Sequence, residues 1–282
     1  MLQNIFQYEF LQNAFLSGIL IGLIAPLLGV FIVVRRMSLI ADALSHVTLA
    51  GIAASLLLSK KVLIFSQVNP IYLGMGFSVT GALFIEKLRT VYKHYEELAI
   101  PIILSAGIGL GVVFISLADG FNTDLFSYLF GSVSAVTRTD LYVIIGVATL
   151  VFFFVISFFK ELFNLSFDEE HSVASGIPAK FIHFLFILTV ALVISASMRI
   201  VGILLVSSLM TLPVAASLRL ANGFKQTVIL SVVLGEVAVI CGLFLAYYLD
   251  LAPGGTIVVL SVLILILSIL WTKAKVKRSQ EI

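Results

Sequence analysis

The sequence predicts an all-α polytopic membrane protein with about nine transmembrane helices, or else eight. Of its 282 residues, 61% are hydrophobic and only 11% are charged, whereas an average soluble domain carries about 25% charged residues. The mean hydropathy of +1.18 is too high for a chain whose surface faces water. A single cysteine excludes a disulfide framework and a cysteine-rich metal site. We therefore expect one transmembrane domain over residues 1–282.

Crossing a bilayer as a helix takes a run of about 20 apolar residues. The sequence contains nine such runs, at residues 13–34, 38–58, 64–86, 98–117, 140–159, 180–198, 200–220, 227–249 and 256–272. The second run is the weakest because it holds Asp42 and His46, and without it eight spans remain. A shorter apolar stretch at 125–136 is either re-entrant or lies along the membrane surface.

The distribution of basic residues predicts the orientation. With nine spans and a cytoplasmic C-terminus, 13 of the 17 Lys and Arg residues lie in inner loops, as the positive-inside rule requires. The four that lie outside are Lys60, Lys61, Arg138 and Arg199. We therefore expect an external N-terminus, which an eight-span topology would move to the cytoplasm.

Small residues recur four positions apart inside the spans, a spacing that lets helix backbones approach closely in lipid. The pairs are Gly18 and Gly22, Ala50 and Ala54, and Gly107 and Gly111. No G-x-x-x-x-G-K-[ST] motif occurs, so the sequence predicts no phosphate-binding loop and no ATP hydrolysis by this chain.

Asp42 and His46 are ionisable residues inside a predicted span, where such groups need a partner, a cavity or a function. Four residues make just over one helical turn, so both side chains project from one face. His46 should lie about 15 Å along the helix from Arg36, near the middle of the bilayer. A carboxylate and an imidazole can bind a divalent metal. Alternatively, the two side chains form a hydrogen-bonded pair that only stabilises packing.

Other polar residues within spans are candidates for a transport pathway. Glu236 could be a third metal ligand, a proton acceptor or a group that a neighbouring helix satisfies. Pro213 frees the carbonyl of Leu209, and such a carbonyl either lines a pathway or marks a purely structural kink. The pathway candidates are Ser207, Ser208, Thr211 and Pro213. We expect His183, near the start of a span, to reach the interface.

Five segments together resemble one family of membrane proteins. They are R-R-M-S-L-I-A-D-A-L-S-H-V-T-L-A-G at 35–51, E-K-L-R-T-V-Y-K-H-Y at 86–95, L-S-F-D-E-E-H-S-V-A-S-G-I-P at 165–178, L-L-V-S-S-L-M-T-L-P at 204–213 and F-L-A-Y-Y-L-D at 244–250. This pattern resembles the ABC-3 family, the membrane permease subunits of bacterial zinc and manganese ABC importers. The segments at 86–95 and 244–250 look most similar to zinc-uptake permeases of Gram-positive bacteria.

The resemblance implies an ABC importer permease in the bacterial plasma membrane. It implies three protein partners: a second copy of the chain, a cytoplasmic ATPase dimer that binds ATP, and an extracellular metal-binding lipoprotein. Asp42 and His46 match the D-x-x-x-H motif that the family associates with its metal pathway. No permanently bound cofactor and no nucleic acid is implied. The transported ion is zinc or manganese, and the imidazole of His46 and the finer resemblance favour zinc.

The polar segment at about 165–178 is the expected coupling element. It holds three consecutive acids, Asp168, Glu169 and Glu170, and then Gly176. In ABC importers a short cytoplasmic helix followed by a glycine docks on the ATPase. The alternative is a solvated loop between two spans.

Two other functions compete with this interpretation. A proton- or sodium-coupled secondary transporter could use Asp42, His46 and Glu236 as a relay. Such transporters often contain inverted repeats, and we find no convincing internal repeat. An intramembrane hydrolase ranks last because neither H-E-x-x-H nor G-x-S-x-G occurs.

Overall fold

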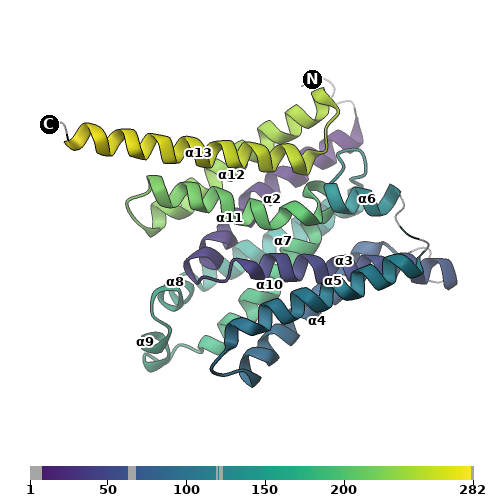
Figure 1. Ribbon diagram of the computed structural model, residues 1–282, viewed down its shortest axis with the longest axis horizontal. Coiled ribbons are helices and arrows are strands. Elements are labelled where there is room, and N and C mark those ends of the chain that lie inside the picture. The colour runs from purple at the N-terminus through teal and green to yellow at the C-terminus, as the bar shows by residue number, and fades with distance from the viewer. Residues whose placement is uncertain (1–7, 63–67, 119, 121–122, 281–282) are drawn as a thin grey trace.

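The protein is a bundle of long helices (Figure 1). The computed structural model describes the chain except residues 1–7, 63–67, 119, 121–122 and 281–282. The described residues form only helices and their connections: α2 (Glu9–Val34), α3 (Leu39–Lys61), α4 (Pro70–Val91), η2 (Glu96–Leu98), α5 (Ala99–Leu117), α6 (Thr123–Phe130), α7 (Arg138–Ser157), α8 (Phe159–Phe167), α9 (Glu169–Ala174), α10 (Ala179–Val201), α11 (Ile203–Leu220), α12 (Phe224–Leu249) and α13 (Pro253–Gln280).

Each of the nine apolar runs corresponds to one long helix. Eight helices of the described chain are long and apolar enough to cross a membrane, and α3 is one of them. The exception is α11, whose apolar part Leu205–Leu220 is shorter. Its 18 residues still extend about 27 Å, close to the thickness of a hydrocarbon core. The start of α2 and the end of α13 lie toward opposite ends of the bundle (Figure 1), as an odd number of crossings would place them.

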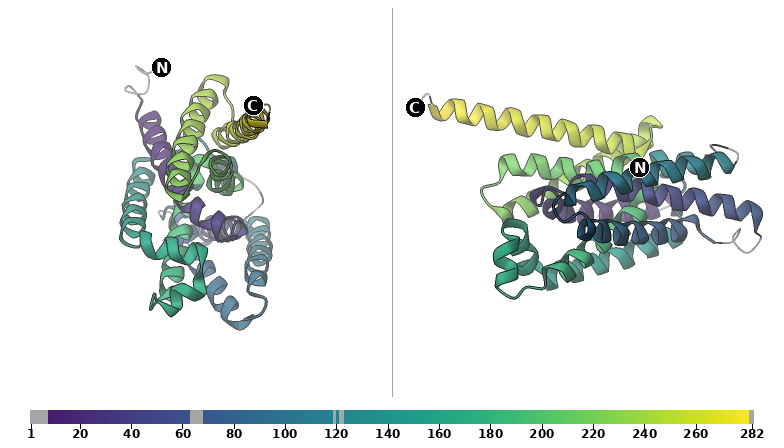
Figure 2. Two further views of the ribbon diagram at one scale, coloured as in Figure 1. Left: turned by 90° about the vertical axis from the view of Figure 1, so that its left-hand side faces the viewer. Right: turned by 60° about the horizontal axis from the view of Figure 1, so that its bottom comes forward.

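Three helices form the inside of the bundle and the others surround them. The buried share of the span residues is 72% in α3 and in α10 and 67% in α2. In α5 and in α13 the buried share is only 22%. Helix α2 packs against α7, α11 and α12, whereas α3 packs against α4, α5 and α11. Helix α13 lies at the edge, and its C-terminal end projects beyond the other helices (Figure 2). The apolar side chains that α5 and α13 leave exposed are suited to contact lipid.

Glycines allow the inner helices to touch through their backbones. At Gly29 of α2, an added Cβ would lie 1.9 Å from the backbone carbonyl oxygen of Met210 in α11. A backbone atom at that distance cannot move aside as a flexible side chain would. Only glycine therefore permits this α2–α11 contact, which brings α11 next to the centre of the bundle.

The apolar stretch at 125–136 does not cross the bundle. Its helix, α6, has eight residues, about 12 Å, and buries Leu125, Tyr128 and Leu129 against α10 and α11. Phe126 is exposed on its other side. Of the two predicted arrangements, the structure favours a short helix lying on one end of the bundle, beside the reversal between α10 and α11.

Asp140 connects three helix ends near α6. Its carboxylate accepts hydrogen bonds from Asn69 Nδ2 before α4 (3.2 Å) and from the Thr137 backbone N–H before α7 (2.9 Å). It also accepts one from Arg199 Nη1 at the end of α10 (2.7 Å). Asp140 is only 2% exposed, and the Arg199 guanidinium lies over the ring of Tyr128. A buried carboxylate with this many donors is well compensated and holds the three ends together.

Replacing Gly29 with valine should destabilise the protein by about 1–3 kcal/mol, because overpacking forces the backbones of α2 and α11 apart. The matched control is Gly109→Val in α5, where an added Cβ meets no atom within 4 Å. Thermal unfolding in detergent should show a lower midpoint for Gly29→Val alone. Equal midpoints for the two variants would contradict the proposed backbone contact.

Candidate metal centre

The helix that carries Asp42 and His46 begins after a tight turn. The N–H of Arg36 donates to the Val33 carbonyl (3.0 Å) and the N–H of Met37 to the Ile32 carbonyl (2.9 Å). Together these are the two bonds of a Schellman motif, with Arg36 in the left-handed region at φ 58°. The turn ends α2, and α3 then starts at Leu39.

Asp42 and His46 project from one face of α3, as predicted, but nearer its start. Asp42 stands in the first turn, and His46 lies about 10 Å from the beginning of a helix that is about 35 Å long. This distance is shorter than the ~15 Å that results when the helical rise is counted from Arg36. The reason is that Arg36 belongs to the turn, so the helical rise counts from Leu39. Both side chains are half-buried.

Neither side chain forms a hydrogen bond or an ion pair with the described residues. The alternative of an internally bonded Asp–His pair is thus not observed. A carboxylate and an imidazole with free lone pairs fit a divalent transition metal, which commonly takes at least four ligands. Within the described residues, no three His, Cys, Asp or Glu side chains gather in a group that could hold a metal ion. The described part of one chain therefore offers only part of a ligand set.

Helix α5 supports α3 directly behind His46. An added Cβ at Gly107 would lie 2.8 Å from the backbone nitrogen of Val47 and 3.1 Å from the carbonyl carbon of His46. One turn on, a Cβ at Gly111 would lie 3.9 Å from Ala50. The predicted small-residue pair therefore lies at this contact, and Gly107 sets the position of the His46 backbone.

The pathway candidates on α11 divide into two groups. Ser208 and Thr211 are half-buried, on a helix that contacts α3, so they remain suited to line a pathway. Ser207 and Pro213 are buried within this chain. The Thr211 hydroxyl donates to the Ser207 carbonyl (3.0 Å). One of the hydroxyls expected to face a pathway is therefore already hydrogen-bonded within α11. The period of the helix explains the division, because neighbouring residues point to different sides.

Glu236 is separated from Asp42 and His46. Both of its carboxylate oxygens are buried, have no hydrogen-bond partner among the described residues, and lie against Gly22 of α2. Pro26 lacks an N–H, which leaves the Gly22 carbonyl without its helical donor. A buried ionised carboxylate costs free energy unless a proton or a cation compensates it. The structure thus gives Glu236 a polar environment of its own at the α2–α12 contact and does not join it to the α3 pair.

The expected coupling segment folds as two short helices, α8 and α9. The Asp168 carboxylate caps α9 by accepting from the His171 N–H (2.8 Å), and Glu169 and Glu170 form its first turn. Negative charge is favourable there because of the helix dipole. Gly176 ends the helix at φ +86°, and the N–H of Ile177 donates to the Ser172 carbonyl (3.1 Å). This geometry follows the sequence pattern closely.

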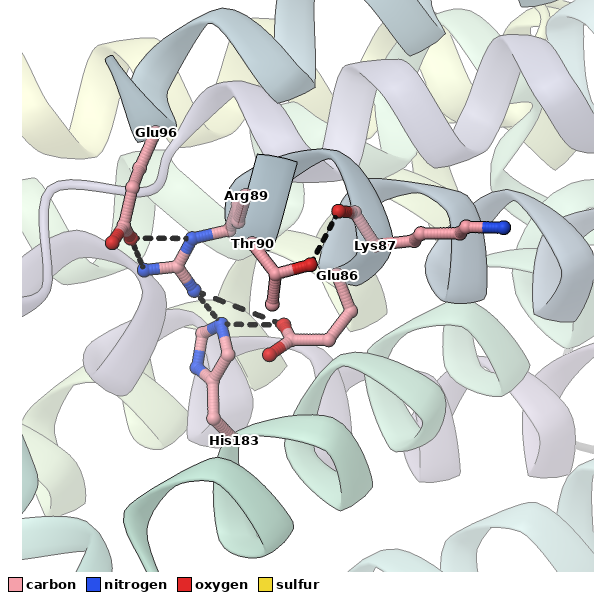
Figure 3. A network of polar contacts seen from close by, with 6 residues as sticks. All are labelled: Glu86, Lys87, Arg89, Thr90, Glu96 and His183. Carbon is pink, nitrogen blue, oxygen red and sulfur yellow. Dashed lines mark hydrogen bonds and ion pairs between the residues drawn. The ribbon is translucent and has the colours of Figure 1, made fainter. Parts of the chain in front are cut away.

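His183 does not reach the interface, contrary to expectation. It is 4% exposed, and its Nε2 lies 3.4 Å from Glu86 Oε2 and beside Arg89 Nη1 (Figure 3). Arg89 in turn donates to Glu96 from Nη2 (2.7 Å) and Nε (3.1 Å). The helical period could have predicted this burial, because His183 lies next to Ile182 and three residues before Phe186, and both of these residues are buried in α10.

Comparison with known proteins finds one family and full-length relatives. The model of the ABC 3 transport family matches residues 7–272. A probable metal transport system membrane protein of Treponema pallidum is 34% identical over 95% of this chain and 97% of that protein. The manganese transport system membrane protein MntC of Listeria monocytogenes is 33% identical over 96% and 93%. Among solved structures, PsaBC from Streptococcus pneumoniae in complex with Fab matches with a TM-score of 0.81 and 32% identity, covering 95% of this chain and 93% of that one.

Gly107→Ala should displace α3 at His46, because the new methyl group meets backbone atoms. Gly111→Ala is the matched control, with the same substitution one turn away and only ordinary van der Waals contact. Titration of the purified full chain with a divalent metal should show weaker binding in Gly107→Ala than in Gly111→Ala. If the two variants bind equally, the α3–α5 contact does not control the position of His46.

Proposed function

The chain belongs to the ABC 3 transport family, and we propose that it is the membrane-spanning permease subunit of an ATP-driven importer for a divalent transition metal ion. The observation that carries this proposal is the Asp42–His46 pair. The pair lies on one face of α3, half-buried, and neither side chain has a hydrogen-bond or ion-pair partner among the described residues. It thereby offers oxygen and nitrogen ligands to a cation inside the membrane.

The metal site requires a second copy of the chain. One chain supplies two ligands, whereas first-row divalent metals are usually bound by four or more. Two copies related by a two-fold axis would present two Asp42–His46 pairs to one another. The half-buried Ser208 and Thr211 of α11, which packs against α3, would then line the same pathway.

The cargo is zinc or manganese. The imidazole of His46 suits zinc, and the affinity order of divalent metals places zinc above manganese. Against this, the Listeria monocytogenes relative is named for manganese transport, as is the manganese import system permease protein ScaB of Streptococcus gordonii, which is 34% identical over 95% of this chain. We therefore assign the cargo as a divalent transition metal and make the two ions separate arms of the test.

Energy and delivery come from other proteins. The sequence has no phosphate-binding loop, so a separate cytoplasmic ATPase dimer binds and hydrolyses ATP, and an extracellular metal-binding lipoprotein delivers the ion. The chain itself is a transport subunit of the plasma membrane with its C-terminus in the cytoplasm. The arginines of the α2–α3 turn and the lysines at both ends of the coupling segment favour this orientation by the positive-inside rule.

Helix α9 docks on the ATPase. It is short, carries three acids at its start, and is exposed apart from Ser172. It lies at the same end of the bundle as the C-terminus, away from α6 (Figure 1). Because α10 begins three residues after Gly176, a displacement of α9 passes directly into a buried helix.

Asp42→Ala and His46→Ala should each reduce metal uptake to background, because each removes a ligand that the second copy cannot replace. The measurement is uptake of zinc and of manganese, separately and in competition, by the complex reconstituted in liposomes. Leu39→Ala, an exposed residue of the same turn, is the control and should retain wild-type uptake. Full uptake by both Asp42→Ala and His46→Ala would refute the proposed metal site. If the wild-type complex takes up neither zinc nor manganese, the proposed cargo is wrong.

Gly176→Trp should reduce the uptake per ATP hydrolysed several-fold while leaving metal binding intact. A non-glycine residue in the left-handed region costs about 1–2 kcal/mol, which distorts the end of α9. Gly223→Trp is the control, because it also meets open space but has extended backbone. Labelling of Val173→Cys, an exposed position of α9, should occur only from the cytoplasm. Labelling only from outside, or unchanged coupling, would contradict the assignment.

A further inference from the structure

Charged side chains from five segments meet at the end of the bundle that carries α9. The segments are the α2–α3 turn, the end of α4, η2, α9 and the start of α10. We call their six residues the charge network: Arg35, Glu86, Arg89, Glu96, Glu169 and His183. None of them belongs to the proposed metal site, and the coupling role of α9 does not by itself explain their arrangement.

One half of the charge network is closed by direct contacts. Arg89 is held by two hydrogen bonds to Glu96 and lies 3.9 Å from Glu86, and His183 lies between Arg89 and Glu86 (Figure 3). These contacts join α4, η2 and α10. Because Arg89 has its carboxylate partners already, it offers little attraction to a further acid.

The other half of the charge network, which consists of Arg35 and Glu169, lacks such direct contacts among the described residues. The Arg35 guanidinium lies 5.8 Å above the ring of Phe186, and its Nη1 is buried without a hydrogen-bond partner in the part of the chain that the structure describes. Burial lowers the pKa of Arg35 from its ordinary value, and the Glu169 carboxylate opposes this change more than any other group. Glu169 is nevertheless exposed and forms no ion pair with Arg35. A buried donor of a charged group without a partner is costly.

Glu169 borders a cavity that it shares with other members of the charge network. This cavity of about 350 Å³ is lined by Glu86, Arg89, Glu169 and His183, among others. The Glu169 side chain thus borders open space beside the closed half of the charge network. Arg35 does not line the cavity itself, but it interacts electrostatically with Glu86, Arg89 and Glu169, which do. An inward movement of α9 would carry the Glu169 carboxylate into this space, on the side of the charge network.

The α2–α3 turn can pass such a movement on. The two Schellman bonds and a bond from the Ile40 N–H to the Met37 carbonyl (3.0 Å) hold Arg35 and the first turn of α3 as one unit. Asp42 stands in that first turn. A displacement of the turn through Arg35 would therefore be passed to the start of the helix that carries Asp42 and His46.

We propose that Arg35 is the positioning residue through which α9 moves α3: Glu169 closes on the unpaired Nη1 of Arg35 when the ATPase drives α9 inward. This inference rests on the proposed function, in which α9 is the coupling element. It assigns Arg35 no contact with the metal, and it makes the Glu169–Arg35 ion pair a feature of one state of the transport cycle.

The test is a double-mutant cycle in the reconstituted complex with its ATPase. Arg35→Gln and Glu169→Gln should each lower the metal uptake per ATP hydrolysed several-fold, with complex assembly and metal affinity unchanged. The double variant should be no worse than either single one, and Arg35→Lys should recover part of the coupling. Glu97→Gln in η2 and Arg36→Gln in the α2–α3 turn, both exposed and outside the charge network and α9, are the controls and should couple like wild type.

Several outcomes overturn the inference. Wild-type coupling in Glu169→Gln, which alters an exposed side chain and should not impair folding, contradicts it directly. Additive effects of the two substitutions, together with a lower melting temperature of Arg35→Gln, would show that Arg35 is only structural. If Gly176→Trp uncouples transport while Glu169→Gln does not, α9 couples by another route; if neither does, the proposed function of α9 fails instead.

Discussion

Direct contact between helix backbones at glycine is the constraint on which the rest of the bundle depends. In lipid there is no hydrophobic force between helices, so close van der Waals packing must hold them together. Gly29 lets α2 touch α11, and Gly107 lets α5 touch α3 behind His46. The ligand-bearing helix and the polar helix beside it therefore take their positions from residues that carry no chemistry.

The two ends of the bundle are built differently. At the α6 end, Asp140 satisfies donors from three helix ends, so those ends are fixed to each other. At the α9 end, the charge network satisfies Arg89 but leaves Arg35 without a hydrogen bond at Nη1. A largely buried guanidinium that has a carboxylate partner, such as Arg199 with Asp140, resists rearrangement, whereas one without such a partner in the described residues gains from it. Such an asymmetry suits a permease in which an energy-supplying partner acts at one end.

Polar groups inside the membrane part fall into separate sites. Asp42 and His46 face outward from α3 with free lone pairs, while the Glu236 carboxylate is enclosed between α2 and α12 against Gly22. Since the two locations do not form one cluster in the described chain, Glu236 has no direct part in the α3 pair. The open ligand pair has the character of a site completed at an interface.

The sequence by itself determined the elements: the apolar runs became helices, the acids at 168–170 began α9, and Gly176 ended it. Such features depend on local hydropathy, capping and backbone conformation, which neighbouring residues dictate. The family followed from motifs, and Asp42 and His46 were found by their spacing on one helical face. Only the tertiary structure decided that His183 is buried beside Glu86 and that Glu236 lies apart from the α3 pair. Those facts depend on which helices pack together and at which rotation, and contacts between residues distant in the chain set both.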